Sequence, residues 1–313
     1  CKTGIRRELS MTGVLIIGYG SIGQRHARLF NELGCEVAVV SRRSVTYTQC
    51  YRAIPEALSA FAADAVVIAS ATHEHASDLR TLAAHGFAGK LLVEKPLTHV
   101  REDLPHFEHA AVAYNLRFHP VMQALSVALQ ERKLLAFDAR IGQYLPDWRP
   151  DSDYRDSYSA DRNQGGGVLC DLSHELDYTA WLCGPWSRLT ALGGQLSHLE
   201  ITSEDVVSIL METAACPAVS IHLNYLQDVV QRQVVAVTDD GTVIADMIAG
   251  TLTTKDGTQH FDCDRDDTYL AQNKALLGGD FDALCSMAEG LAAVDTIEAA
   301  RRALRDKQWI TAP

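Results

Sequence analysis

Short apolar runs separated by amphipathic segments characterise the first third of the chain. The runs consist almost entirely of Val, Leu, Ile and Ala and lie at 14–17, 37–40, 65–69 and 90–93. Strands buried on both faces of a parallel sheet have this composition. Helical spacing follows the first run, from Gln24 to Phe30, and the third run, up to about His85. The pattern predicts an α/β domain with a doubly wound parallel sheet, and a further strand at 110–113.

The rest of the chain has a different pattern. Antiparallel strands are predicted at 206–211, 218–223 and 233–237, and Asp239-Asp240-Gly241 is a hairpin turn signal. Helical patterns occur within 269–292, at 296–305, and after the glycines 165–167 as far as 182. We expect a second, α+β domain with a mostly antiparallel sheet. The first domain would span residues 11–119 and the second residues 120–313, with residues 1–10 as an extension outside the fold.

Composition and charge narrow the class of protein. A chain of 313 residues can hold two domains, each with its own core. A net charge of −12 argues against general binding of nucleic acid or an anionic membrane. No apolar run approaches the roughly 20 residues of a membrane helix. The eight cysteines lack zinc-type spacing, and residues 1–10 lack the apolar core of a signal peptide. We therefore expect a cytoplasmic protein without a bound metal.

A glycine motif follows the first predicted strand directly. Gly18, Gly20 and Gly23 form G-x-G-x-x-G between a strand and a helix, which is the context that a dinucleotide fingerprint requires. The glycines allow a tight turn, close approach of a pyrophosphate and close helix packing. Ser21 and Ile22 open the helix, whose N-terminus favours phosphate. The alternative is an ordinary turn between strand and helix.

The end of the second strand indicates which dinucleotide binds. NAD-binding proteins usually carry an acidic residue there, whereas this chain has Ser41, Arg42 and Arg43. Two guanidinium groups and a hydroxyl suit a 2′-phosphate, so we favour NADP(H) over NAD(H). The alternative is a solvated basic turn.

The loop after the third strand also lies where open α/β sheets bind ligands. It contains Ser70, Thr72, His73 and His75. The two histidines could ligate a metal, but no further ligand set accompanies them. We therefore expect Ser70, Thr72 and His75 to line the cofactor.

The segment from Gly165 to Asp177 combines three glycines with acid–base side chains. Asp171 and His174 are three residues apart, so on a helix they would share a face. A carboxylate beside an imidazole can orient it and tune its proton affinity. This segment is therefore a candidate for proton transfer.

Three motifs together resemble the glucose–fructose oxidoreductase, inositol dehydrogenase and rhizopine-catabolism (Gfo/Idh/MocA) family. They are Glu94-Lys95-Pro96 after the fourth strand, Asn115-Leu116-Arg117-Phe118-His119-Pro120, and the Gly165–Asp177 segment. The resemblance, from Met11 to the C-terminus, implies an N-terminal Rossmann domain and a C-terminal domain with an open-faced sheet. That sheet face packs against another subunit in the family, so a homodimer or homotetramer is implied.

The resemblance also implies roles for individual residues. Lys95 would be catalytic near the nicotinamide, Glu94 and Lys95 would contact the cofactor, and the Lys95–Pro96 bond could be cis. Asn115 and Arg117 would border nicotinamide and substrate, or would instead form a turn and a salt bridge between domains. Three further residues are candidates for catalysis: Asp171, His174 and Asp177. The spacing from Asp171 to His174 is one residue shorter than usual, through a deletion or because the chain belongs to a subgroup resembling members of bacterial surface-sugar pathways.

An aromatic and arginine-rich stretch, 144–162, lacks helical or strand periodicity. It supplies the candidate substrate contacts Tyr144, Trp148, Arg149, Tyr154 and Arg155. Aromatic faces suit sugar rings and arginines suit phosphates, so a nucleotide-linked sugar would satisfy both. The alternative is a loop that covers the cofactor or contacts another subunit.

These observations predict an NAD(P)-dependent oxidoreductase that moves a hydride between nicotinamide and a secondary alcohol or ketone of a sugar, nucleotide-linked or amino. His174 would take the hydroxyl proton, Asp171 or Asp177 would orient His174, and Lys95 would stabilise the reacting oxygen. Two alternatives stay open: an NAD-dependent glycosidase with transient redox chemistry, and a catalytically silent NAD(P)-binding regulatory protein.

Overall fold

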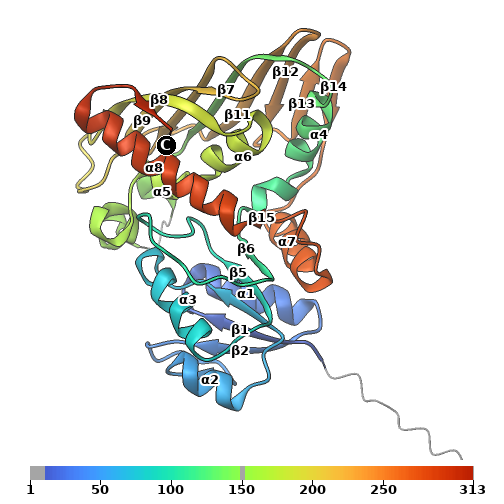
Figure 1. The fold of residues 1–313 in the computed structure, drawn as a ribbon, viewed down its shortest axis with the longest axis vertical. Helices are drawn as coiled ribbons and strands as arrows, with labels where there is room; N and C mark the ends of the chain where they lie inside the picture. Colours follow the sequence, from blue (N-terminus) through green and yellow to red (C-terminus); the bar gives the residue numbers. More distant parts are fainter. Residues whose placement is uncertain (1–10, 149–151, 313) are drawn as a thin grey trace, which may run out of the picture.

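Two separate sheets, one above the other in Figure 1, organise the computed structural model, which describes residues 11–148 and 152–312. Within these residues, sheet A has the order β15-β6-β5-β4-β1-β2-β3, and sheet B has the order β14-β13-β12-β11-β7-β10-β9-β8-β16. The strands of sheet A are β1 (Gly13–Ile17), β2 (Glu36–Val40), β3 (Cys50–Tyr51), β4 (Ala65–Ile68), β5 (Lys90–Val93), β6 (Ala110–Val112) and β15 (Cys285–Ser286). Those of sheet B are β7 (Leu134–Gly142), β8 (Trp186–Gly194), β9 (Val206–Thr213), β10 (Val219–Asn224), β11 (Gln231–Thr238), β12 (Gly241–Asp246), β13 (Thr251–Thr254), β14 (Gly257–His260) and β16 (Ile310–Thr311).

Sheet A confirms the predicted doubly wound α/β domain. β1 lies between β2 and β4 and is parallel to both, with Leu15 opposite Ala38 and Val66. All five residues of β1 are buried, which explains the uninterrupted apolar run. The helices α1 (Ser21–Glu32), α2 (Ile54–Ala60) and α3 (His75–Ala84) belong to this domain. Only the edge strand β15 runs antiparallel to its neighbour within the described part of the sheet.

Sheet B confirms the predicted mostly antiparallel sheet. Its only parallel pair, among the strands that the structure describes, is β7 with β10. One face carries buried residues such as Phe137, Ile209 and Ile221, and α4 (Pro120–Leu129) and α6 (His174–Cys183) pack against strands of this sheet. The opposite face carries side chains such as Arg140 and Leu210, which are exposed. This difference between the faces produces the alternation of buried and exposed residues along the strands.

The C-terminal part of the chain returns to the first domain. α7 (Asp267–Gly278) packs against α1, and β15 pairs with β6 in sheet A. α8 (Met287–Asp306) then contacts strands of both sheets and lies between the domains in Figure 1. We propose a domain boundary at residue 119, but this returning segment of the second domain also packs against the first domain. The predicted break near 292–296 is wrong, because the sequence there contains neither Pro nor Gly and the helix continues through it.

The glycine-led segment forms two short helices instead of the single helix predicted. α5 (Val168–Asp171) ends before Leu172 and Ser173, and α6 begins at His174. Asp171 therefore closes one helix and His174 opens the next, so the expected shared helical face is not formed. The 144–162 stretch consists, where described, of short 3-10 turns: η3 (Leu145–Trp148), η4 (Tyr154–Asp156), η5 (Tyr158–Ala160) and η6 (Arg162–Gln164). Arg149 lies outside the described residues.

Candidate active site

The turn between β1 and α1 has the form of a phosphate-binding cradle. Gly18 has a φ of +92°, and a Cβ there would lie 2.5 Å from the backbone oxygen of Ala69, so only glycine suits the position. Gly20 has no neighbouring atom within 4 Å of a Cβ position, which leaves its outer side open. No side chain caps the N-terminus of α1, which begins with Ser21, Ile22 and Gly23. An uncapped helix N-terminus behind an open glycine turn suits a pyrophosphate.

The predicted 2′-phosphate contacts at the end of β2 are partly occupied by protein groups. The exposed Arg42 forms an ion pair with Glu74, which belongs to the 3-10 helix η1 (Thr72–Glu74). The hydroxyl of Ser41 donates to the carbonyl of Arg43 over 3.1 Å. Arg43 is exposed and forms no ion pair within the described residues. The basic turn is thus accompanied by an acidic neighbour that the local sequence did not indicate.

The side chains of Ser70 and His75 tie loops together. Ser70 donates to Asp78 over 2.6 Å, and the buried His75 places its ring nitrogens 3.2 Å from the carbonyl oxygens of Leu97 and Ser70. Burial lowers the pKa of His75, which keeps the ring neutral. Because other protein groups engage these side chains, we do not propose a cofactor contact for either. Thr72 instead lies beside the glycine run of the second domain, 3.5 Å from a Cβ position at Gly165.

Lys95 extends from the end of β5 to the second domain. Its Nζ donates a hydrogen bond of 2.7 Å to the backbone oxygen of Asp171. The Lys95–Pro96 bond is cis, as the family resemblance implied. Protein groups engage both oxygens of the Glu94 carboxylate: one lies 2.9 Å from Nε2 of His26, and the other accepts from the Lys95 backbone N–H over 3.1 Å. The side chain of Glu94 therefore holds the lysine segment, and we propose no cofactor contact for it.

His174 opens α6 beside this lysine. It is only 8% exposed, its Nδ1 has no hydrogen-bond partner among the described residues, and its ring meets Tyr114 edge-on at 5.5 Å. Burial, together with the positive charges of Lys95 and Arg232, holds the pKa of His174 well below its ordinary value of 6.5. The imidazole is therefore neutral at neutral pH and able to accept a proton.

The expectation that a carboxylate orients His174 is wrong, because both candidates bind elsewhere. The Asp171 carboxylate accepts from the hydroxyl of Tyr225 over 2.6 Å. Asp177 accepts two hydrogen bonds from Arg117, of 3.0 and 2.7 Å. These contacts make Asp171 part of the wall of the site and Asp177 part of a buried ion pair.

Asn115 and Arg117 link neighbouring elements of the protein, which was the alternative to contact with nicotinamide or substrate. Asn115 donates to the hydroxyl of Thr268 over 2.7 Å, so it links the 3-10 helix η2 (Asn115–Phe118) to α7. Arg117 binds Asp177 and, at 2.9 Å, Glu289, so it links η2 to α6 and α8. Neither side chain is proposed to touch nicotinamide or substrate.

The residues of the 144–162 stretch fall into two groups. Trp148 meets Tyr225 edge-on at a centroid distance of 5.3 Å, and its buried indole N–H has no acceptor among the described residues. It thus lies next to the tyrosine that binds Asp171. The half-buried Tyr144 packs against the core of the same domain.

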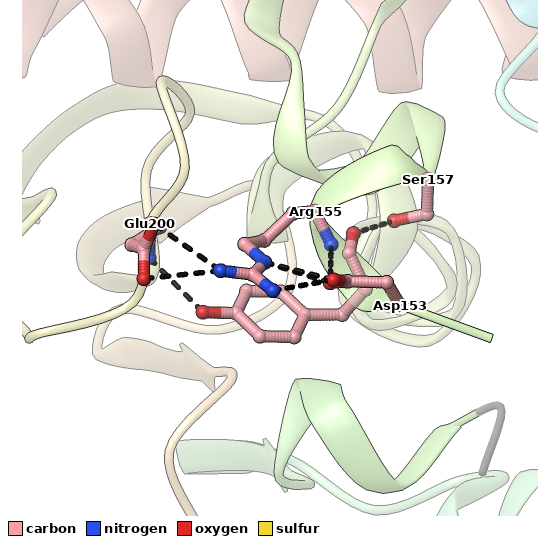
Figure 2. A network of polar contacts seen from close by, with 5 residues as sticks. Asp153, Arg155, Ser157 and Glu200 are labelled. Carbon is pink, nitrogen blue, oxygen red and sulfur yellow. Dashed lines mark hydrogen bonds and ion pairs between the residues drawn. The ribbon is translucent and has the colours of Figure 1, made fainter.

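Arg155 and Tyr154 instead contact the loop that contains Glu200. Arg155 lies between Asp153 and Glu200 and donates to both carboxylates, as Figure 2 shows. The hydroxyl of Tyr154 accepts from the backbone N–H of Glu200 over 3.2 Å. These contacts fix one loop to another, so a substrate contact is not proposed for Arg155 or Tyr154.

Four residues near the site were missed by the sequence analysis: His26, Tyr114, Tyr225 and Arg232. Arg232, on β11, donates to the fully buried Glu175 over 2.8 Å and adds positive charge near His174. Only His26 gave a usable signal, because it lies three residues after Gly23 on the buried face of α1. The others are brought to the site by strand pairing between distant segments.

Two general features of the described residues bear on the chemistry. They contain no group of three or more His, Cys, Asp or Glu residues that could hold a metal ion. None of their helices combines the length and apolar character needed to span a membrane.

Comparison with known proteins identifies the class and the family. The fold and glycine turn agree with a match of residues 12–120 to an oxidoreductase family with an NAD-binding Rossmann fold. Residues 133–244 match the Gfo/Idh/MocA C-terminal domain. The chain therefore belongs to the Gfo/Idh/MocA family and is an NAD(P)-binding oxidoreductase. No curated protein gives a significant match.

Several solved structures share the fold over nearly the whole chain. GenD2 from gentamicin A biosynthesis, in complex with NAD, is 21% identical with a TM-score of 0.77, and 97% of each chain is covered. Levoglucosan dehydrogenase with NADH is 15% identical with a TM-score of 0.80, covering 96% of this chain and 99% of that one. The WlbA dehydrogenase from Bordetella pertussis, with NADH and UDP-GlcNAcA, is 18% identical with a TM-score of 0.77, covering 97% and 99%.

Proposed function

We propose that this protein is a sugar dehydrogenase or ketoreductase that uses a nicotinamide dinucleotide. The observation that carries the proposal is the meeting of Lys95 and His174 between the domains. Lys95 comes from the strand end of the dinucleotide domain, and His174 comes from the glycine-led segment of the other domain. The hydrogen bond from Lys95 to the backbone of Asp171 brings the two segments together.

In the oxidative direction His174 would act as the general base. Its lowered pKa keeps the imidazole neutral, so it can take the proton of a secondary hydroxyl as the oxygen gains negative charge. Lys95 would donate a hydrogen bond to the same oxygen and stabilise the charge that develops there. Bound nicotinamide supplies the hydride acceptor, or the donor in reverse. In reduction the two residues would return a proton to the carbonyl oxygen.

The structural neighbours support a sugar as the substrate class. Levoglucosan dehydrogenase acts on a sugar derivative by its name, and WlbA was solved with a nucleotide-linked sugar. In this chain the half-buried Trp148 packs edge-on against Tyr225, the tyrosine that binds Asp171. Aromatic surfaces with a few polar groups suit sugar rings. We propose a nucleotide-linked or amino sugar.

We also propose NADP(H) as the preferred cofactor and a homodimer or homotetramer as the assembly. Arg42 and Arg43 support the first, since guanidinium groups suit a 2′-phosphate, whereas Glu74 opposes it. The open face of sheet B supports the second, because Leu192 and Leu210 are 76% and 51% exposed on it.

The experiment is a kinetic panel of free and nucleotide-linked sugars with NAD and NADP. For the sugar that is turned over, Lys95→Met and His174→Gln should each lower kcat by about a hundred- to ten-thousandfold. Dinucleotide affinity should stay within about twofold, because neither residue belongs to the phosphate cradle. Exposed residues provide matched controls, Lys133→Met and His198→Gln, which should keep full activity. Near-wild-type turnover in either site variant would overturn the proposal.

A further inference from the structure

His26 is a buried polar residue that the mechanism above does not use. It lies on α1 three residues after the last glycine of the cradle and is 0% exposed. Its ring stacks on Phe30 at 6.2 Å and meets Tyr269 edge-on at 5.7 Å. Buried polar side chains among aromatic rings usually have a specific hydrogen-bond partner. For His26 that partner is Glu94, 2.9 Å from Nε2.

The contact has a defined direction. A carboxylate only accepts hydrogen bonds, so Nε2 of His26 carries the proton that points to Oε1 of Glu94. Nδ1 has no partner among the described residues. The second oxygen of Glu94, Oε2, accepts from the backbone N–H of Lys95. One carboxylate therefore joins the side chain of His26 to the backbone of the residue that we place at the reacting oxygen.

These contacts connect the phosphate-binding helix to the lysine. α1 carries the cradle at its N-terminus and His26 on its buried face. The backbone N–H of Glu94 also donates to the carbonyl of Ile68 over 2.8 Å, which fixes the end of β5 on the neighbouring strand. With its backbone and both carboxylate oxygens bound, Glu94 has little freedom to move, and the Lys95 backbone is held in turn.

We propose that His26 is a positioning residue that acts through Glu94 to hold Lys95 in reach of the substrate oxygen. This inference rests on the proposed function only for the role of Lys95 in catalysis. Positioning within a fraction of an ångström matters for rate because misplaced groups lose much of their effect on the transition state.

The test measures the chemical reactivity of Lys95 in the full-length protein. Acetylation by acetic anhydride is followed by mass spectrometry, with Lys133 as the internal reference. His26→Phe removes the donor and should raise Lys95 labelling about tenfold, because the hydrogen bond to Asp171 is made less often. His26→Gln keeps a donor and should stay within about twofold of wild type. Unchanged labelling in a folded His26→Phe protein would overturn the proposal.

Glu94→Leu tests the same link without changing α1. A leucine side chain accepts a hydrogen bond from neither His26 nor the Lys95 backbone, so Lys95 labelling should rise as in His26→Phe. In the double variant the increase should be no larger than in either single one, because both changes break one chain of contacts. Independent, multiplying effects would show that His26 acts elsewhere. If His26→Phe fails to fold, unchanged labelling in Glu94→Leu overturns the proposal by itself.

The labelling needs no substrate, so the two proposals can fail separately. Predicted labelling together with no oxidation of any sugar would contradict the proposed function and leave the positioning role standing. With an active substrate, His26→Phe should lower kcat about tenfold while the dinucleotide affinity and KM stay within about twofold. A loss confined to KM or to dinucleotide affinity would contradict positioning of Lys95.

Discussion

The cofactor preference that Arg42 indicates in the sequence is changed by its neighbour in the structure, Glu74. Two arginines after β2 predict a 2′-phosphate site, and they do so from the local sequence alone. The structure adds Glu74, which comes from the loop after β4 and forms an ion pair with Arg42. A 2′-phosphate would have to compete with this carboxylate for the guanidinium group, because like charges near one site repel. The preference between NADP and NAD therefore depends on the ion pair between Arg42 and Glu74.

Glu74→Gln should raise affinity for NADP relative to NAD by about tenfold. The substitution removes a negative charge and releases Arg42 for charge-assisted hydrogen bonds with the phosphate. Dissociation constants for both dinucleotides provide the measurement. The control is Glu32→Gln, which breaks an exposed ion pair with Arg28 elsewhere on the same domain and should change neither constant. An unchanged or lowered NADP to NAD ratio in Glu74→Gln would contradict this account.

Strands whose residues are buried could be predicted from the sequence, whereas exposed strands could not. The strands of sheet A could be predicted because burial on both faces leaves an uninterrupted apolar run, as in β4. β14 could not, because all four of its residues are exposed. The break between α5 and α6 carries no Pro or Gly, since Leu172 and Ser173 occupy it, so only tertiary packing defines it. Motifs therefore singled out Lys95 and His174, which lie near each other in the structure, but did not indicate that Asp171 binds Tyr225.

Arg117 is the clearest case of an element held by one side chain. Its guanidinium is 6% exposed and binds Asp177, which is 3% exposed. Arg117→Met should lower the free energy of unfolding by about 3–5 kcal/mol, because Asp177 would remain buried without its partner. Chemical denaturation measures the change. Arg28→Met, which breaks the solvent-exposed ion pairs with Glu32 and Asp266, should lower the free energy of unfolding far less than Arg117→Met does. Equal effects of the two substitutions would contradict the buried ion pair.

At the scale of the whole molecule, burial of histidines links stability to pH. Burial lowers the pKa of five histidines from 6.5: His75, His99, His119, His174 and His222. As the pH falls below 6.5, the unfolded chain takes up protons before the folded one does. Acid therefore favours the unfolded state, and stability rises with pH across this window. Lys95 and Arg232 add to the effect at His174, so part of this pH dependence comes from the site itself.

The free energy of unfolding should therefore decrease as the pH is lowered from about 7.5 to about 5.5. His174→Gln, which cannot titrate, should show a smaller fall than wild type, and His198→Gln, at an exposed position, should match wild type. Denaturation at a series of pH values provides the data. A stability that stays constant or increases on acidification through this range would contradict the burial of these rings.

Lys95 and His174 come from different domains, and we propose that they act on one substrate oxygen. The most direct test compares kcat of Lys95→Met, His174→Gln and the double variant under saturating dinucleotide. Residues that act as a unit lose most of their effect together, so the double variant should be no more than about threefold slower than the slower single variant. If the two losses multiply, the residues act independently and the account of a shared site is wrong.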